Sequence, residues 1–439
     1  MFKTFINAFK VKDIRLKLLF TLLMLVVVRL GCQIPAPGFS QDKLQAMMSS
    51  LFGEGGIGGM FGAFTGGSFE KMSIFALNIT PYITSSIIMQ LMTIAIPKLE
   101  ELQNDGEDGR KKIASITRYV TVGLALLESG AIAIGFGSQG LLTEYNALSV
   151  ITVIASMTAG SAFLMWAGER ITEKGVGNGI SIVLIINIIS SFPSDAKTLF
   201  DQFVKPKSVA TGVLNSVIII LIVLVLVVMV IILSDATRKI PLQYAKKIQG
   251  NKMMGGNTST IPVKINTAGV MPVIFASSIL QTPLIISRMV NYNGTGWWSE
   301  AMKYMNQNYW FNKDNFIYTL GVIAYIGMCI FFAYFYTSIT FNPVEIANNL
   351  KKAGGFVPGI RPGKPTSDYL NTVLNYVIFI GAVGLTIVAL YPLIFAGLFG
   401  ANISFGGTSI IIVVGVIIET VKQVESQMIV RNYKGFLND

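Results

Sequence analysis

Residues 212–233 read GVLNSVIIILIVLVLVVMVIIL and contain no charged side chain. A helix of about 20 apolar residues spans a bilayer, and a helix that is apolar on every side has no face suited to water. Residues 316–340 and 372–399 are also free of charge. The whole chain is 52% hydrophobic and 13% charged, whereas soluble domains are roughly a quarter charged. These features predict an integral membrane protein.

Working outward from this stretch, the apolar pattern predicts ten membrane-spanning helices. An even number of spans puts both termini on one side of the membrane. That side then carries 25 of the 34 Lys and Arg residues and the other side eight, with Arg29 inside the first span. Because Lys and Arg concentrate in cytoplasmic loops, we expect a plasma-membrane protein with both termini in the cytoplasm. The expected spans are 16–34, 72–96, 113–137, 148–168, 179–193, 211–233, 266–289, 315–340, 372–396 and 406–428.

Two loops on the basic side are longer than connectors usually are. Residues 234–265 contain an alternating, strand-like stretch, KIPLQY, at 239–244, and residues 341–371 combine a short helical stretch with a Pro- and Gly-rich tip. Such loops can be solvated basic segments facing anionic lipid, or docking surfaces for a cytosolic partner. Their patterning favours docking.

The segment between the first two spans is rich in glycine and almost free of charge. Residues 51–72 read LFGEGGIGGMFGAFTGGSFEKM, in which Gly53, Gly55 and Gly58 satisfy G-x-G-x-x-G. No strand precedes these glycines and no acidic ribose ligand follows, so a dinucleotide site is disfavoured. Non-helical backbone at membrane depth must be buried in protein or line a cavity. We therefore predict a short segment that folds back into the protein.

The sequence lacks the residues that most enzymatic and cofactor chemistry requires. The chain has no histidine, no phosphate-binding G-x-x-x-x-G-K-[ST] motif and two cysteines, Cys32 and Cys329, both in apolar segments. We expect no enzyme activity, no cofactor and no metal. A secondary transporter would need convergent charges at mid-membrane, and an intramembrane enzyme would need a nucleophile and a base. The clearest intramembrane charges, Arg29, Glu128 and Glu419, are scattered, although an Arg29–Glu128 ion pair is a hypothesis worth testing.

Seven local strings occur in one order along almost the whole chain and together closely resemble the SecY family, the large subunits of bacterial protein-conducting channels. The strings are RLGCQIPAPG (29–38), NITPYITSSIIMQLMTIAIPKLEEL (78–102), GEDGRKKIASITRY (106–119), FLMWAGERITEKGVGNGISI (163–182), IPVKINTAGVMPVIFASS (261–278), FNPVEIANNLKKAGGFVPGIRPGKPT (341–366) and FGGTSIIIVV (405–414).

The resemblance implies an all-α membrane protein of ten helices in two inverted five-helix halves, residues 1–193 and 194–439, around an hourglass pore. It implies a channel that passes unfolded secretory chains across the membrane and releases apolar helices sideways through a lateral gate. A plug at about residues 55–65 would seal the outer funnel, with Gly59, Met60, Phe61 and Phe64 as its candidate residues.

The resemblance also implies an apolar pore ring. Such a ring excludes water and ions by dewetting, while its aliphatic side chains can part around a polypeptide. Without the resemblance, these residues would read as ordinary core positions. Residue by residue, the ring would comprise Ile83, Ile87, Ile180, Leu184, Ile274 and Ile412, in which Leu184 replaces the isoleucine common in bacterial relatives.

Gate and docking residues follow in the same way. Gln90, Asn266 and Ser277 match polar lateral-gate positions, although they could equally be generic contacts between helices. Docking of the SecA motor or the ribosome is expected at Arg361, with Arg238, Lys246, Lys247 and Lys351 as further candidates, and RNA phosphates would be bound without base readout. The other expected partners are SecE, SecG, signal sequences, unfolded preproteins and membrane lipid.

Overall fold

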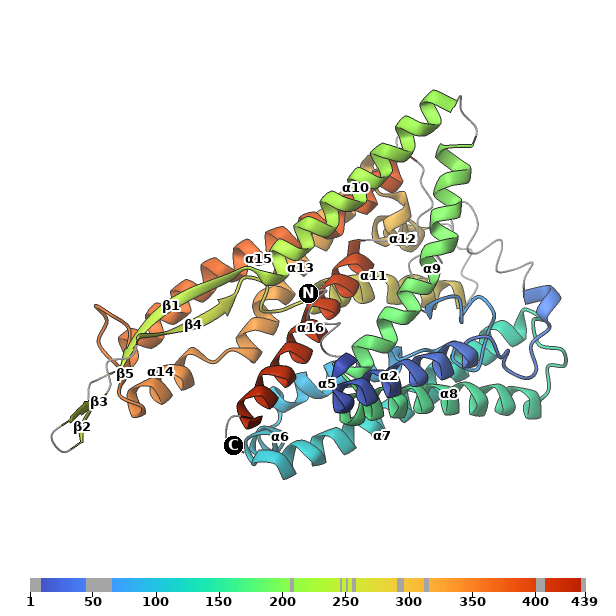
Figure 1. Ribbon diagram of the computed structural model, residues 1–439. Coiled ribbons are helices and arrows are strands. Elements are labelled where there is room, and N and C mark those ends of the chain that lie inside the picture. Colours follow the sequence, from blue (N-terminus) through green and yellow to red (C-terminus); the bar gives the residue numbers. More distant parts are fainter. Residues whose placement is uncertain are drawn as a thin grey trace. The chain divides into compact units, whose positions relative to one another are not determined.

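The computed structural model describes residues 9–44, 65–205, 209–244, 247–249, 252–254, 258–289, 296–311, 316–399 and 407–435 (Figure 1). It is largely helical, and each of the ten segments predicted to span the membrane overlaps a long helix. These helices are α2 (Lys12–Gly31), α5 (Thr80–Ala95), α7 (Gly106–Ser138), α8 (Ala147–Lys174), α9 (Gly179–Phe203), α10 (Val209–Asp235), α11 (Met271–Met289), α13 (Leu320–Thr340), α15 (Lys364–Phe399) and α16 (Gly407–Gly435).

Six helices in the described part of the chain are long and apolar enough to cross a bilayer. The number becomes seven if α5 and the following α6 (Pro97–Asn104), which meet at an angle of 107°, count as one bent span. The protein is therefore a multi-pass membrane protein of the predicted class, while the count of ten spans stays a prediction.

The predicted start of the second span, residue 72, is wrong. Residues 66–79 form turns apart from Ser73, which makes an isolated β-bridge to Pro35, and α5 begins only at Thr80. The backbone here pairs with the segment after α2: the Ala36 amide donates to the Met72 carbonyl at 2.8 Å, and the Ile74 amide donates to the Ile34 carbonyl at 3.0 Å. These tertiary hydrogen bonds replace those of a helix, a competition that hydropathy cannot detect.

The described residues divide into two compact units. The first comprises residues 1–217, 284–300 and 399–439, and the second comprises residues 218–283 and 301–398. This division follows contacts within the chain. The two inverted halves implied by the resemblance remain a prediction.

In the first unit, α7 packs against both α5 and α8 (Figure 1). Its buried residues form a stripe of small side chains. Side chains four positions apart share one helix face, and small side chains let membrane helices approach closely. Hydroxyl groups on the stripe hydrogen-bond across the contacts, Thr121 with Ser85 of α5 and Ser129 with Thr158 of α8. The buried stripe consists of Gly109, Thr117, Thr121, Ala125, Ser129, Ala133 and Gly137.

The second unit contains a three-stranded antiparallel sheet in the order β4-β1-β5. Strand β1 (Thr237–Tyr244) pairs along its length with β4 (Thr258–Lys264), which confirms the strand-like reading of this loop. Its end also pairs with β5 (Gly355–Phe356), which belongs to the other long loop. A separate hairpin joins β2 (Lys247–Gln249) to β3 (Lys252–Met254).

One hydrophobic core holds this sheet against the helices of the second unit. Ile240, Leu242 and Val263 of the sheet are each at most 3% exposed. They share a cluster with Leu350 of α14 (Pro343–Lys352) and with Leu370 of α15. The two predicted loops are thus one folded structure continuous with membrane helices.

Candidate functional site

Five of the six predicted ring residues lie on three helices of the first unit. Ile83 and Ile87 are on α5, Ile180 and Leu184 on α9, and Ile412 on α16. The first four are half-buried, whereas Ile412 is 2% exposed. Ile83 and Ile180 pack against the same buried cluster, which contains Ile79, Leu164 and Val183, and α9 contacts α16.

Two glycines next to Ile180 let the backbones of α8 and α9 come into contact. A Cβ at Gly179 would lie 1.9 Å from the Gly168 carbonyl oxygen, and a Cβ at Gly168 would lie 2.8 Å from Ile180 Cγ1. Both distances are too short for any other residue without movement. The string GERITEKGVGNGI therefore specifies a close helix contact that sets the position of Ile180.

The other ring and gate residues stay predictions. Ile274 is half-buried on α11 in the second unit. Gln90 is half-buried on α5 in the first unit, whereas half-buried Asn266 and buried Ser277 belong to the second. The predicted cluster of the three would have to join the two units. The predicted plug residues, Gly59, Met60, Phe61 and Phe64, lie outside the described residues.

Arg361, the main docking candidate, is exposed at a rigid turn. Gly359 (φ 81°) and Gly363 (φ 105°) flank it in the left-handed region that glycine adopts readily. The Thr366 hydroxyl donates to the Arg361 carbonyl at 2.8 Å, and buried Val357 anchors the start of the turn. The Arg361 side chain is therefore exposed to solvent on a turn whose backbone is held by a hydrogen bond and a buried residue.

Two further docking candidates share the structure that carries Arg361. Arg238 is exposed on β1 opposite Val263, and Lys351 is exposed in the last turn of α14. We call β1, β4, β5, α14 and the turn at 357–366 the basic platform. Lys247 lies in β2, but its side chain, like the whole of Lys246, is outside the described residues.

The Arg29 side chain reaches the backbone of the turn segment that precedes α5. Its guanidinium donates to the Gly66 carbonyl at 3.3 Å. In the described part of the chain no ion pair joins Arg29 to Glu128, so the structure does not support that hypothesis. Asn187 of α9 donates to the side-chain oxygen of Asn78 at 3.0 Å, and both residues are buried. Segment 65–79 is thereby tied to α2 and α9.

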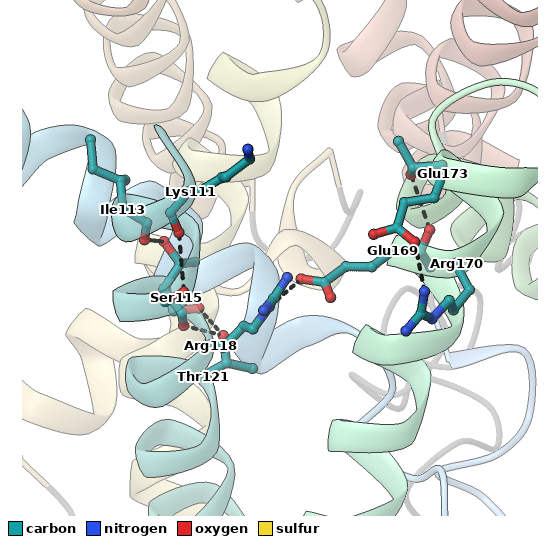
Figure 2. Close-up of polar contacts among 12 residues, drawn as sticks. Lys111, Ile113, Ser115, Arg118, Thr121, Glu169, Arg170 and Glu173 are labelled. Carbon is teal, nitrogen blue, oxygen red and sulfur yellow. Dashed lines mark hydrogen bonds and ion pairs between the residues drawn. The ribbon is translucent and has the colours of Figure 1, made fainter. Parts of the chain in front are cut away.

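Sequence reasoning missed a group of ion pairs on α7 and α8 (Figure 2). Arg118 of α7 donates through Nε to Glu169 of α8 at 2.8 Å, and Arg170 pairs with Glu173 on its own helix at 2.7 Å. Arg170 also lies 5.8 Å from the ring centroid of Trp166. Glu169 directly follows Gly168, so the interhelical pair lies beside the close glycine contact. The sequence did contain a signal for the interhelical pair. Arg118 lies near the start of one predicted span and Glu169 at the end of the next, and the two ends of antiparallel helices lie side by side.

Known proteins match this chain over most or all of its length. Residues 73–421 match the family model SecY. The protein translocase subunit SecY of Streptomyces coelicolor is 43% identical, with 100% of each chain covered.

Solved structures share the fold. A protein-conducting channel has a TM-score of 0.63 and 18% identity, with 95% of this chain and 93% of that chain covered. Sec61 in a canine ribosome–channel complex has a TM-score of 0.60 and 17% identity, with the same coverage. With the family model matching most of the sequence and a relative matching from end to end, this chain belongs to the SecY family.

Proposed function

We propose that this chain is the channel subunit of a protein translocase, through which unfolded polypeptides cross the plasma membrane. The observation that carries the proposal is the 43% identity over the full length of both chains to a protein translocase subunit SecY. The chain contributes the pore and its seal, and a separate partner supplies direction and energy.

The physical basis of the seal is an apolar constriction. Aliphatic side chains on α5, α9 and α16 offer water no hydrogen bonds, so a narrow passage lined by them dewets and blocks ions. Aliphatic side chains have no hydrogen bonds to one another that would have to break, so they can part around a passing polypeptide. Five candidates on three helices of one unit support this assignment. The plug and the sideways release of apolar helices through a gate at Gln90, Asn266 and Ser277 belong to the same proposal.

The basic platform is proposed as the cytoplasmic docking surface. Arg361, Arg238 and Lys351 present cations from one folded structure, and arginine's planar fork suits carboxylates and RNA phosphates. The partners would be the SecA motor and the ribosome, with SecE and SecG as accompanying subunits. The Sec61 relative in a ribosome complex supports the ribosome as a partner. Both termini would lie in the cytoplasm.

The proposed function is tested by purification of the chain from membranes and reconstitution in proteoliposomes. We expect small helical subunits and a motor ATPase to copurify, and a preprotein with a signal sequence to become protected from protease inside the vesicles when motor and ATP are present. Flux of a small solute without any partner, together with no preprotein protection, would instead identify a secondary transporter.

The ring assignment predicts that Ile83→Asn or Ile412→Asn wets the constriction. The variants should leak ions from vesicles at rest and should translocate substrates with weak signal sequences. Ile220→Asn is the matched control, because Ile220 is 66% exposed on α10, a helix that carries none of the proposed ring residues. If both ring variants leak ions no faster than the unsubstituted protein and still reject substrates with weak signal sequences, the ring assignment is wrong.

The docking assignment predicts that Arg361→Glu weakens binding of the ribosome or motor about tenfold or more, and that the slope of log affinity against log salt falls by about one. Arg361→Lys should recover part of the affinity, since it restores charge without the planar fork. Lys43→Glu makes the same charge change on the predicted outer side and should leave binding unaltered. Equal binding by Arg361→Glu and the unsubstituted protein would rule Arg361 out.

A further inference from the structure

Helix α12 (Trp297–Met305) has two adjacent, exposed tryptophans that the channel function does not explain. Trp297 is 79% exposed and Trp298 37% exposed, and their rings meet edge to face at 5.5 Å. Large aromatic side chains grouped at a surface mark a site of contact with lipid or with another protein. Their surroundings decide whether these tryptophans contact lipid, another protein or water.

The C-terminal end of α12 is fixed to the beginning of the membrane helix α13. The Tyr304 carbonyl accepts a hydrogen bond from Trp310 Nε1 at 2.8 Å and lies so close to Gly321 of α13 that a Cβ there would be 2.0 Å from the oxygen. Trp310 is fully buried and packs on Tyr325, with ring centroids 5.7 Å apart. This end of α12 therefore lies where α13 enters the bilayer.

The surface beside this junction is apolar and exposed. Ile317, in the 3-10 turn that leads into α13, and Leu320 and Ile323, in its first turn, are 56–65% exposed. Apolar side chains exposed on a membrane span contact acyl chains. Lys303 of α12 lies 5.8 Å from the Tyr318 ring, which also meets Tyr304 at 5.1 Å. Tyrosines and tryptophans beside a lysine, next to the end of a span, are the side chains that membrane interfaces select.

We propose that α12 is an interfacial anchor, with Trp297 and Trp298 inserted among the phospholipid headgroups at this end of α13. Nine helical residues extend only about 13 Å, so a helix fixed at Tyr304 keeps both tryptophans near that interface. The indole rings place apolar area against the upper acyl chains and N–H groups against headgroup oxygens. The lipid-facing surface of α13 then continues onto α12.

Tryptophan quenching in proteoliposomes tests this proposal. Two proteins are compared, the unsubstituted chain and Trp297→Phe/Trp298→Phe, and the difference in emission isolates the pair from Trp166 and Trp310. Vesicles contain phosphatidylcholine with bromine near the headgroup end of the acyl chain, bromine near the methyl end, or none. We expect the difference signal to be blue-shifted and to lose most of its intensity with shallow bromine and little with deep bromine.

Two results would overturn the proposal. Strong quenching by aqueous iodide without quenching by either bromolipid would place the pair in water. Protection from iodide and both bromolipids would place a protein, such as a second copy or an outer subunit, over the helix. Should the double variant fold poorly, Trp297→Tyr alone keeps an interfacial aromatic residue, and its difference signal should show the same preference for shallow bromine.

Discussion

At the scale of single residues, glycine decides how closely α8 and α9 approach. The Gly168 carbonyl and the Gly179 Cα lie so near each other that no side chain fits between them. Ile180 follows at once, so the position of a proposed ring residue depends on two residues that have no side chain. In the proposed ring, aliphatic side chains would supply the seal, and the two glycines set the position of Ile180.

This arrangement predicts that Gly179→Ala destabilises the protein. The new Cβ would overlap a backbone carbonyl that cannot rotate away, and overpacking of this kind costs about 1–3 kcal/mol. A lower melting temperature in detergent and faster ion leak from vesicles should follow. Gly123→Ala is the control, since Gly123 lies within α7 with no atom within 4 Å of its would-be Cβ, and alanine there should stabilise the helix by up to about 1 kcal/mol. Equal stability of the two variants would contradict the close contact.

At the scale of elements, the helices were largely predictable and the basic platform was predictable only in part. Each of the ten segments that hydropathy indicated overlaps a helix, because a span must satisfy its backbone hydrogen bonds internally. The strand at 239–244 was visible as alternation, since Ile240 and Leu242 face one side and Lys239 and Gln243 the other. The pairing of Gln243 with Phe356 was not visible, because it joins residues more than a hundred positions apart.

The helix contacts carried a signal that sequence reasoning missed. Small residues recur every four positions along α7 from Thr117 to Gly137, and they form its buried face. The start of the predicted second span is wrong because of backbone pairing that hydropathy does not record. Its first residues are largely apolar, yet the Ile74 amide donates to the Ile34 carbonyl and the Met72 carbonyl accepts from the Ala36 amide, in place of helical hydrogen bonds. Hydropathy records burial and not the partner of each amide.

The platform's core predicts the effect of Ile240→Ala. Ile240 is 2% exposed in β1, so its truncation leaves a cavity and costs about 2–5 kcal/mol of local stability. We expect trypsin to cut the 234–265 hairpin faster and partner binding to weaken, while membrane insertion is unchanged. Thr260→Ala, on the exposed face of β4 opposite Pro241, should alter neither. Unchanged proteolysis of Ile240→Ala would mean that the platform is held by other contacts.

At the scale of the whole molecule, charge asymmetry predicts the orientation in the membrane. The native thiols, Cys32 and Cys329, are buried, so the background labelling should be low. Lys364→Cys, at the start of α15, should react with a membrane-impermeant maleimide only from the cytoplasmic side. Tyr145→Cys, between α7 and α8 at a site 56% exposed, should react only from outside. Labelling of both from the same side would refute the predicted topology.

Some properties of this protein follow from the sequence alone, because each is local or additive. Apolar runs such as 212–233 are long enough to span a bilayer wherever the rest of the chain lies, and the basic loops predict their orientation. The ordered strings also sufficed to indicate the family.

Other properties needed the tertiary structure. They are the approach of Gly179 to Gly168, the turns before α5, the sheet that unites two distant loops, and the attachment of α12 to α13. Each depends on which atoms of separate elements meet in the fold. Hydropathy and charge counts are properties of single segments, whereas close packing and hydrogen bonding are properties of pairs.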